Sequence, residues 1–233
     1  MDQHSTLQQI DREGRERLYP SVTNPSWLVL RKRREIFQQW IEQLPSSGLN
    51  VLDIGGRLQP YRPLLGARVA RYVGVDLRPT PMVNILARGE ALPLRADSFD
   101  LVICTQVLQY SADPPALLRE AHRVLRNGGH LFLSAPSASI QDSDQECWRF
   151  LPHALRQMLT CFRTVEIVPE GGSVAGLFRT MNSCLNVFVR YPALRVVYQH
   201  SLSPILNVTG AVLDHIAGSN QQFTTNYSVL ARK

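Results

Sequence analysis

The stretch of sequence that decides the fold runs from residue 51 to residue 61 and reads VLDIGGRLQPY. An apolar run ends in Asp53, and Gly55 and Gly56 follow it almost at once. Glycine has no side chain to obstruct an approach, so this turn can bring bare backbone next to a ligand. The stretch therefore predicts either a nucleotide-binding turn after a buried strand or an ordinary strand that ends in a tight loop.

A second apolar run, YVGVDL at residues 72–77, favours the nucleotide-binding alternative. It ends in Asp76, 23 residues after Asp53, and an acid at that place can accept hydrogen bonds from both hydroxyls of a ribose. The G-x-G-x-x-G pattern of a pyrophosphate cradle is absent, because Leu58 and Pro60 occupy the later positions of the turn. An acid beside the glycines would also repel a phosphate. Two acids fit S-adenosylmethionine instead, which carries a sulfonium and an ammonium group.

Short apolar runs alternate with helical segments from residue 49 onward. Asp113 and Pro114 are expected to begin a helix that Gly128 and Gly129 close. Alternation of this kind predicts an open α/β sheet with its ligand site at the carboxyl ends of the strands. The runs expected to form buried parallel strands are NVLDIG, ARYVGVDL, FDLVICTQV and GHLFLSAP.

The segments on either side of this core are less regular. Residues 1–24 are charged and are expected to be mobile or lid-like, and a helix capped by Asn24 follows, with Pro25 at its first position. The basic run Arg31 to Arg34 in that helix is either a solvated face or a phosphate or membrane contact. We expect four parts: a helical cap at 1–48, a cofactor-binding core at 49–170, a helical insertion at 171–222 and a closing strand at 223–233.

Composition sets the broad class. The chain has 233 residues, of which 44% are apolar and 19% charged, as in a soluble globular protein. The 25 Lys and Arg against 19 Asp and Glu give a net charge of +6, which favours an anionic substrate or an acidic membrane surface without establishing either. No basic stripe with interleaved aromatic residues is present, so nucleic acid is not an expected partner. Four cysteines without CxxC spacing predict reduced thiols in a cytosolic protein, and neither a secretory signal nor a convincing membrane span is apparent.

From residue 49 to about 136 the chain resembles class I S-adenosylmethionine-dependent methyltransferases. It looks most like the bacterial "methyltransferase domain 11" type that is often associated with glycan and polysaccharide biosynthesis. Four motifs in the expected order carry the resemblance: VLDIGG, YVGVDL, GEALPLRADSFDLVICTQVLQY and LLREAHRVLRNGGHLFLSAP. The resemblance implies a Rossmann-like α/β fold, with a seven-stranded, mostly parallel sheet whose last hairpin is reversed.

The resemblance also implies roles for individual residues. In such a domain Asp76 would bind the ribose, Leu77 would pack against the adenine, and Arg57 could pair with the methionine carboxylate or point to solvent. The other positions implied are Asp53, Gly55 and Gly56 at the methionine end, Arg88, Gly89 and Glu90 along the adenine edge, and Thr105 and Gln106 beneath the methyl donor.

The chain departs from the family at several of these positions. Arg57 and Gln59 replace later glycines of the turn, Arg88 stands where the family commonly has Asp, and Gln109-Tyr110 replaces a Glu-His pair. These changes leave open how the turn is formed and which group, if any, acts as a general base.

A hydroxyl acceptor needs its proton removed near the transition state. Tyr110 is closest to the expected methyl group, but a tyrosine with its ordinary pKa of about 10 is a poor base, so we expect it to orient the acceptor or to wall the pocket. His153 is the best-placed histidine, with a surface position as the alternative. Trp148 and Arg149 are candidates for a sugar- or phosphate-binding wall, although Trp148 could serve packing alone. No metal-ligand spacing is present.

The sequence therefore predicts a bacterial cytoplasmic methyltransferase that uses S-adenosylmethionine and acts on an oxygen of a sugar, glycan or related small-molecule acceptor. The alternative is a non-catalytic scaffold with the cofactor fold. The insertion at 171–222 could form a homodimer, cover the substrate or lie on the inner face of the membrane.

Overall fold

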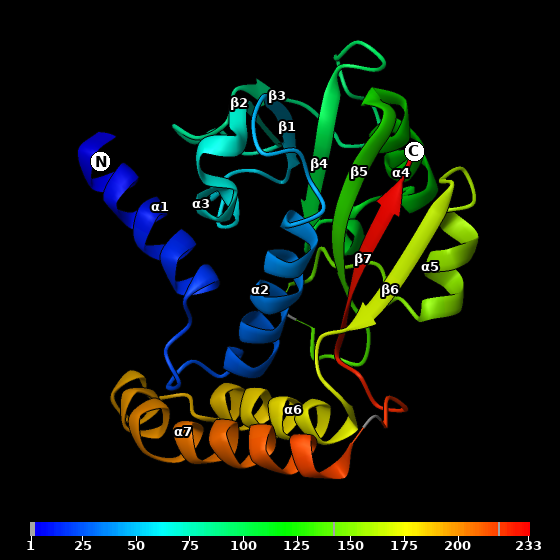
Figure 1. Cartoon of the computed structure of the whole chain (residues 1–233). Coiled ribbons are helices and arrows are strands. Elements are labelled where there is room, and N and C mark those ends of the chain that lie inside the picture. The colour runs from blue at the N-terminus through cyan, green and yellow to red at the C-terminus, as the bar shows by residue number, and fades with distance from the viewer. Residues whose placement is uncertain (1–2, 142, 219) are drawn as a thin grey trace.

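The computed structural model describes residues 3–141, 143–218 and 220–233, with side chains from residue 7 onward. A seven-stranded sheet in the order β3-β2-β1-β4-β5-β7-β6 forms its centre (Figure 1). All neighbouring strands pair in parallel except β7, which is antiparallel to both β5 and β6. The strands are β1 (Leu49–Ile54), β2 (Val69–Asp76), β3 (Ile85–Leu86), β4 (Phe99–Thr105), β5 (Leu125–Pro136), β6 (Thr164–Pro169) and β7 (Asn226–Arg232). The predicted sheet, including its reversed last hairpin, is confirmed.

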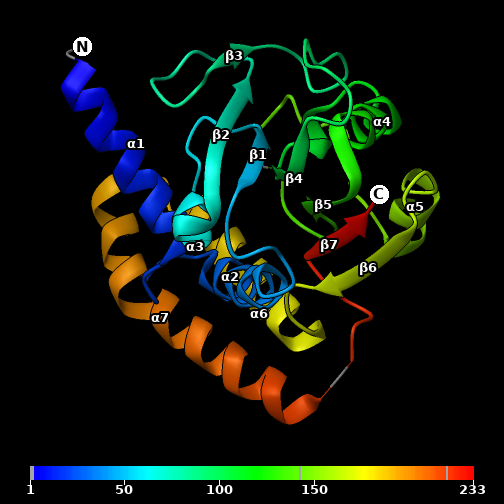
Figure 2. The same cartoon turned by 45° about the horizontal axis from the view of Figure 1, so that its top comes forward.

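Helices cover both faces of the sheet and one end of it (Figures 1 and 2). Helix α2 packs against one face, whereas α4 and α5 pack against the other. The helices are α1 (Gln3–Leu18), α2 (Trp27–Ile41), α3 (Arg62–Leu65), α4 (Pro114–Val124), α5 (Pro152–Met158), α6 (Ser173–Phe188) and α7 (Pro192–Ala217), with short 3₁₀ turns η1 (Gly66–Arg68) and η2 (Leu108–Tyr110).

The central strands are apolar on both sides because each face is covered by helices. In β4, Leu101 and Ile103 join Phe37 of α2 on one side, whereas Val102 joins Leu118 of α4 on the other. The apolar run of β4 is thus divided between the two faces with a period of two. Because β1 pairs in parallel with β2 and β4, the carboxyl ends of these three strands lie at the same edge of the sheet.

The charged N-terminal segment forms α1, which ion pairs four residues apart, such as Arg15 with Asp11 at 3.0 Å, and the burial of Leu18 support. Two helix boundaries differ from those expected. Helix α2 begins at Trp27, since Asn24 accepts a bond from the Ser26 amide in a turn before the helix.

The second such boundary is the end of the helix capped by Asp113. The cap itself is confirmed, since the Asp113 carboxylate accepts a bond from the Ala116 amide at 2.9 Å. The helix ends at Val124, however, and not at Gly128 and Gly129, because Leu125 already pairs with β4 at the start of β5.

Helices α6 and α7 form an antiparallel hairpin between β6 and β7, beyond the carboxyl end of the sheet. In Figure 1, β4 runs from the top of the molecule toward the end that carries this hairpin, and both helices contact α2. Among the residues that the structure describes, no helix is long and apolar enough to cross a membrane.

Candidate functional site

A cavity of about 700 Å³ lies at the carboxyl ends of β1, β2 and β4. One side of it is formed by the turns that follow these strands, and the other side by α1, the start of α2 and α6. The ligand position expected for an open α/β sheet is therefore a real cavity in this structure.

The glycine turn lies at the edge of this cavity and is held against β2. The amides of Gly55 and Gly56 both donate to the Val75 carbonyl, at 2.8 and 3.1 Å. Gly55 has φ of 80°, and a Cβ at this position would lie 2.2 Å from Cγ2 of Val107. Glycine is thus required here by backbone conformation and by the close approach of Val107. Gly55 lines the cavity, and Gly56 lies beneath it against Asp53.

Asp53 is buried directly under this turn and does not line the cavity. The hydroxyl of Tyr72 donates to its Oδ2 at 2.7 Å. Burial, with a further contribution from the charge of Asp76, raises the pKa of Asp53 to about 7, although the Tyr72 bond opposes the rise. Among the side chains that the structure describes, no cation pairs with Asp53, so this buried carboxyl group has no counter-ion at this end of the cavity.

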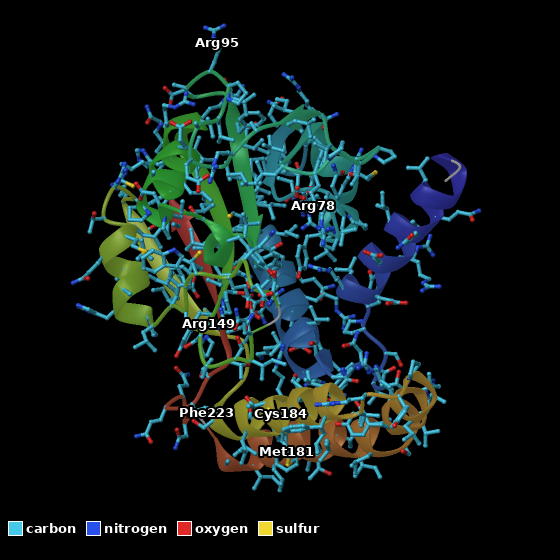
Figure 3. All side chains as sticks on the ribbon, turned by 180° about the vertical axis from the view of Figure 1, so that it is seen from behind. Arg78, Arg95, Arg149, Met181, Cys184 and Phe223 are labelled. Carbon is cyan, nitrogen blue, oxygen red and sulfur yellow. The ribbon has the colours of Figure 1, made fainter. Side chains whose placement is uncertain are left out.

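Asp76 and Leu77 are open to the cavity at the end of β2. Asp76 accepts a bond at Oδ1 from the backbone amide of Arg78 at 2.9 Å, which fixes the carboxylate at the strand end. The Leu77 side chain is 65% exposed, an unusual exposure for an apolar residue beside a cavity. The two carboxylate oxygens of Asp76 can accept hydrogen bonds from the hydroxyls of a ribose, and the apolar surface of Leu77 beside them suits a purine ring. Figure 3 labels Arg78, which also lines the cavity, at the end of β2.

Residues 88–90 form the next part of the wall. A Cβ on Gly89 would lie 2.8 Å from Cδ1 of Leu117, so this segment passes close to α4. Glu90 accepts bonds from the Ser111 hydroxyl at 2.6 Å and the Ala112 amide at 3.1 Å. Partial burial tends to raise the pKa of Glu90, but these bonds outweigh it and lower the pKa below its usual value. Glu90 is therefore an anionic wall residue tied to the loop after β4.

The departures at positions 57 and 59 have different consequences. Gln59 adopts φ of 45°, the left-handed conformation that favours glycine, and its amide donates to the Met82 carbonyl at 2.6 Å. The turn therefore keeps a glycine-like backbone at this position without a glycine. Arg57 lines the cavity and could meet an anionic group there.

The end of β4 supplies Thr105, Gln106 and Tyr110, which all line the cavity. Gln106 adopts φ of 56°, and its side chain donates to the Ser134 hydroxyl at 3.0 Å. Tyr110, in η2, is 41% exposed. The structure thus brings the predicted Gln106 and Tyr110 into one wall with Gly55 and Asp76.

Three predicted residues lie apart from this wall. His153 is exposed on α5, where its ring nitrogen lies 3.1 Å from the Gln157 amide, and it is not among the cavity-lining residues. Trp148 donates to the Ser111 carbonyl at 2.9 Å behind the rim, and Arg149 pairs with Glu146 at 2.8 Å (Figure 3). The surface alternative for His153 is the one that the structure supports, because α5 lies on the outer layer of the sheet.

Sequence reasoning missed the buried ion pair on the far side of the cavity. Arg33 of α2 lines the cavity and donates from Nε and Nη2 to both oxygens of Glu170, each at 2.8 Å. Burial opposes the charge of Arg33, but Glu170 outweighs it and raises the Arg33 pKa. The side-chain amide of Asn226 is assigned with its oxygen toward Arg33 and Gln106. In this orientation the oxygen accepts hydrogen bonds from Arg33 at 2.8 Å and from Gln106 at 3.0 Å. This chain of contacts joins the far wall to the end of β4.

Other polar residues of the far wall come from elements that no single motif links. They are Glu13, Glu16 and Arg17 of α1, Asn24 and Ser26 of the connection to α2, and Arg179 of α6. Arg179 lies within 3.4 Å of the Ser26 hydroxyl. Of the basic run at residues 31–34, Arg33 alone is among the cavity-lining residues, and it is paired with Glu170.

The strand-end side of the cavity fits S-adenosylmethionine. Asp76 offers carboxylate oxygens, and apolar surface comes from Val75, Leu77, Ala87 and Leu117. A cationic ligand above the turn would favour the ionised form of the buried Asp53. Among the residues that the structure describes, no group of three or more His, Cys, Asp or Glu is arranged to hold a metal ion.

Comparisons with known proteins agree with this geometry. Residues 52–133 match the family model of the methyltransferase domain. The ubiquinone biosynthesis O-methyltransferase of Pseudomonas aeruginosa is 29% identical over 111 residues, which are 41% of this chain and 48% of the relative. This chain therefore spans about half the length of the curated relatives that it matches.

Solved structures share the fold over most of the chain. A SAM-dependent methyltransferase from Archaeoglobus fulgidus superposes with a TM-score of 0.54 at 17% identity, over 94% of this chain and 97% of that one. The [4+2]-cyclase SpnF superposes with a TM-score of 0.52 at 16% identity, over 86% of this chain and 81% of that one. The match over residues 52–133 agrees with the resemblance seen in the sequence to class I S-adenosylmethionine-dependent methyltransferases, and the solved structures share the fold over most of the chain.

Proposed function

We propose that this protein transfers a methyl group from S-adenosylmethionine to an oxygen of a sugar, glycan or related small-molecule acceptor. The observation that carries the proposal is the single cavity wall formed by Gly55, Asp76, Gln106 and Tyr110, which faces a polar wall across the same cavity. The strand-end wall suits the donor, and the polar wall suits a hydroxylated acceptor.

When bound, S-adenosylmethionine supplies a methyl group on a positively charged sulfur. Asp76 would hold the ribose hydroxyls, Leu77 and Leu117 would cover the adenine, and residues 88–90 would follow its edge. Arg57 would pair with the methionine carboxylate. Asp53 would stabilise the positive ligand from beneath the turn without touching it, because the glycine backbone lies between them.

The acceptor would lie toward α1, α2 and α6. Asn24, Ser26 and Asn226 line this part of the cavity and can exchange hydrogen bonds with hydroxyl groups. Tyr110 would orient the reacting hydroxyl, so that the reaction is favoured by positioning. His153 is left out of the proposal because of its exposed place on α5. The name of the curated relatives, ubiquinone biosynthesis O-methyltransferase, supports oxygen as the acceptor atom.

A non-catalytic scaffold remains the competing function, because a fold alone does not fix an activity. The [4+2]-cyclase illustrates this, since it shares the fold and its name gives a reaction other than methyl transfer. The test incubates the purified protein with methyl-labelled S-adenosylmethionine and separate pools of sugars, nucleotide sugars, glycans and phenols. We expect label on a carbohydrate hydroxyl, and a lower kcat for Tyr110→Phe with little change in cofactor affinity. Label on phenols alone would overturn the acceptor class, and cofactor binding without transfer to any pool would favour the scaffold.

A further inference from the structure

The α6–α7 hairpin is polar where it faces the protein and apolar where it faces solvent. Of the 22 large apolar side chains that are exposed among the described residues, 14 lie between Leu177 and Ile216. On the last part of α7, Ile205, Val208, Val212 and Ile216 recur at intervals that place them on one helical stripe, and all four are exposed. Leu177, Met181 and Phe188 form the equivalent exposed stripe on α6, and Figure 3 labels Met181 at the end of the molecule opposite Arg95.

The opposite face of each helix is buried and polar. Asn182 of α6 donates to the Ser203 hydroxyl at 3.1 Å and to Asn207 of α7 at 3.0 Å. Asn207 in turn donates to the carbonyls of Val22 at 2.7 Å and Asn24 at 2.9 Å. These bonds satisfy the buried groups and fix the hairpin to the rest of the protein, so the apolar stripes cannot turn inward without breaking them.

This distribution is the reverse of a helix that covers a water-soluble core, in which the apolar stripe faces inward. Fourteen exposed apolar side chains on two neighbouring helices mark a site of contact with a protein partner or a membrane. Among the described residues, neither helix of the hairpin is both long and apolar enough to cross a membrane, so the contact that it fits is one made along a surface.

The charges of the hairpin indicate what kind of surface it would contact. Arg190 and Arg195 are exposed at the turn between the two helices, next to Phe188 and Tyr191, which are 78% and 71% exposed. Between residues 171 and 213 the sequence has no acid. Asp214 is engaged, since its carboxylate accepts the amides of Gly172 and Ala175, each at 2.9 Å.

Aromatic side chains beside arginines at the tip of an apolar hairpin are typical of segments that bind the interface of an anionic bilayer. The same tip on a second copy of this chain is a poorer partner. It would place arginines opposite arginines, and the hairpin has no free acid that could pair with them.

We infer that the apolar face of α6 and α7 binds the surface of a membrane that contains anionic lipid. The cavity would then lie close to the bilayer, since Arg179, on the inner face of α6, lines it. Only the thickness of one helix, about 10 Å, separates that inner face from the membrane face. The inference rests on the hairpin and does not depend on the proposed methyl transfer.

The test is flotation of the purified full chain with vesicles of a three-to-one mixture of phosphatidylcholine and phosphatidylglycerol, and with vesicles of phosphatidylcholine alone. We expect the protein to float with the mixed vesicles at low salt and to float less as salt rises. Replacing Ile205 and Val212 together by Glu should reduce the bound fraction by about tenfold or more. Arg190→Ala should reduce it by about fivefold.

Leu86→Glu is the matched control, because Leu86 is 61% exposed in β3 and lies outside the hairpin; it should float like the wild type. Ile205→Trp keeps the face apolar and gives a second readout, a blue shift of its fluorescence on adding mixed vesicles. Sedimentation of the wild type at the bottom of the gradient at low salt would overturn the inference. So would a wild-type dimer that ignores vesicles and becomes a monomer in the Ile205→Glu, Val212→Glu variant.

Discussion

Two buried carboxylates near the cavity are held in opposite ways. Glu170, just after β6, accepts bonds from Arg33 at both oxygens and from the hydroxyls of Ser134 at 2.7 Å and Ser228 at 2.6 Å. Asp53, at the end of β1, has the hydroxyl of Tyr72 as its side-chain partner and no counter-ion among the described side chains.

The difference indicates what each side of the cavity is for. A buried carboxylate with a bidentate arginine and two hydroxyls is satisfied by the protein itself, so its role is to fix Arg33 and join α2 to the sheet. A buried carboxylate without a cation is costly in the absence of a ligand. That cost is relieved when a positive ligand binds above the glycine turn, as S-adenosylmethionine would.

Breaking the ion pair between Arg33 and Glu170 is expected to have the largest effect on stability. Glu170→Gln would leave the Arg33 guanidinium buried without its counter-charge, and we expect the free energy of unfolding to fall by about 3 to 5 kcal/mol. Urea denaturation of the wild type and the variant measures the difference. Glu35→Gln is the control, since Glu35 pairs with Arg31 and Lys32 at the surface and should cost less than about 1 kcal/mol. Equal losses in the two variants would contradict this account of Glu170.

The glycine turn above Asp53 gives the second comparison. Gly55 and Gly48 both have φ of 80°, but a Cβ on Gly48 would have no atom within 4 Å, whereas one on Gly55 would lie 2.2 Å from Val107. Gly48→Ala should therefore cost only the backbone strain, about 1 kcal/mol. Gly55→Ala adds a clash and should cost about 2 to 4 kcal/mol. Thermal unfolding of the two variants side by side checks this, and a Gly55→Ala variant as stable as Gly48→Ala would show that the turn can move away from Val107.

The third comparison measures how the ionisation of Asp53 changes stability with pH. Its pKa in the folded protein is about 7, above the ordinary value of 3.8, so the folded state holds the proton more tightly than the unfolded state does. The contribution of Asp53 to stability is therefore fully present below about pH 4 and is lost as pH rises toward 7. Between pH 5 and pH 7 the loss should be about 2 kcal/mol.

Asp53→Asn should remove this part of the pH dependence, as measured by urea denaturation of the ligand-free protein at both pH values. The same slope in the wild type and the variant would assign the dependence to other groups.

The strand-end wall could be predicted from the sequence because its parts are local. The strand, the acid and the glycines of residues 51–56 are adjacent, and Asp76 ends the next strand of the same unit. The turn was harder to predict at Gln59, whose left-handed conformation depends on a bond to Met82 in a later loop.

The far wall depends on contacts that no local pattern encodes. Arg33 and Glu170 are 137 residues apart, and nothing in the basic run singles out Arg33 from its neighbours. The sequence predicted a helical insertion at 171–222, but not that the stripe of Ile205, Val208, Val212 and Ile216 faces outward. That orientation is set by Ser203 and Asn207, whose partners lie in the connection between α1 and α2.

Isothermal titration with S-adenosylmethionine tests the central claim most directly, since the account requires the strand-end wall to bind this cofactor. We predict saturable binding to the wild type, and a loss of affinity of about 100-fold or more for Asp76→Ala, which removes hydrogen bonds from a charged acceptor. Glu166→Ala, which changes an exposed acid on β6, should bind as the wild type does. No detectable binding to the folded wild type, or equal affinity in the Asp76→Ala variant, would contradict the account.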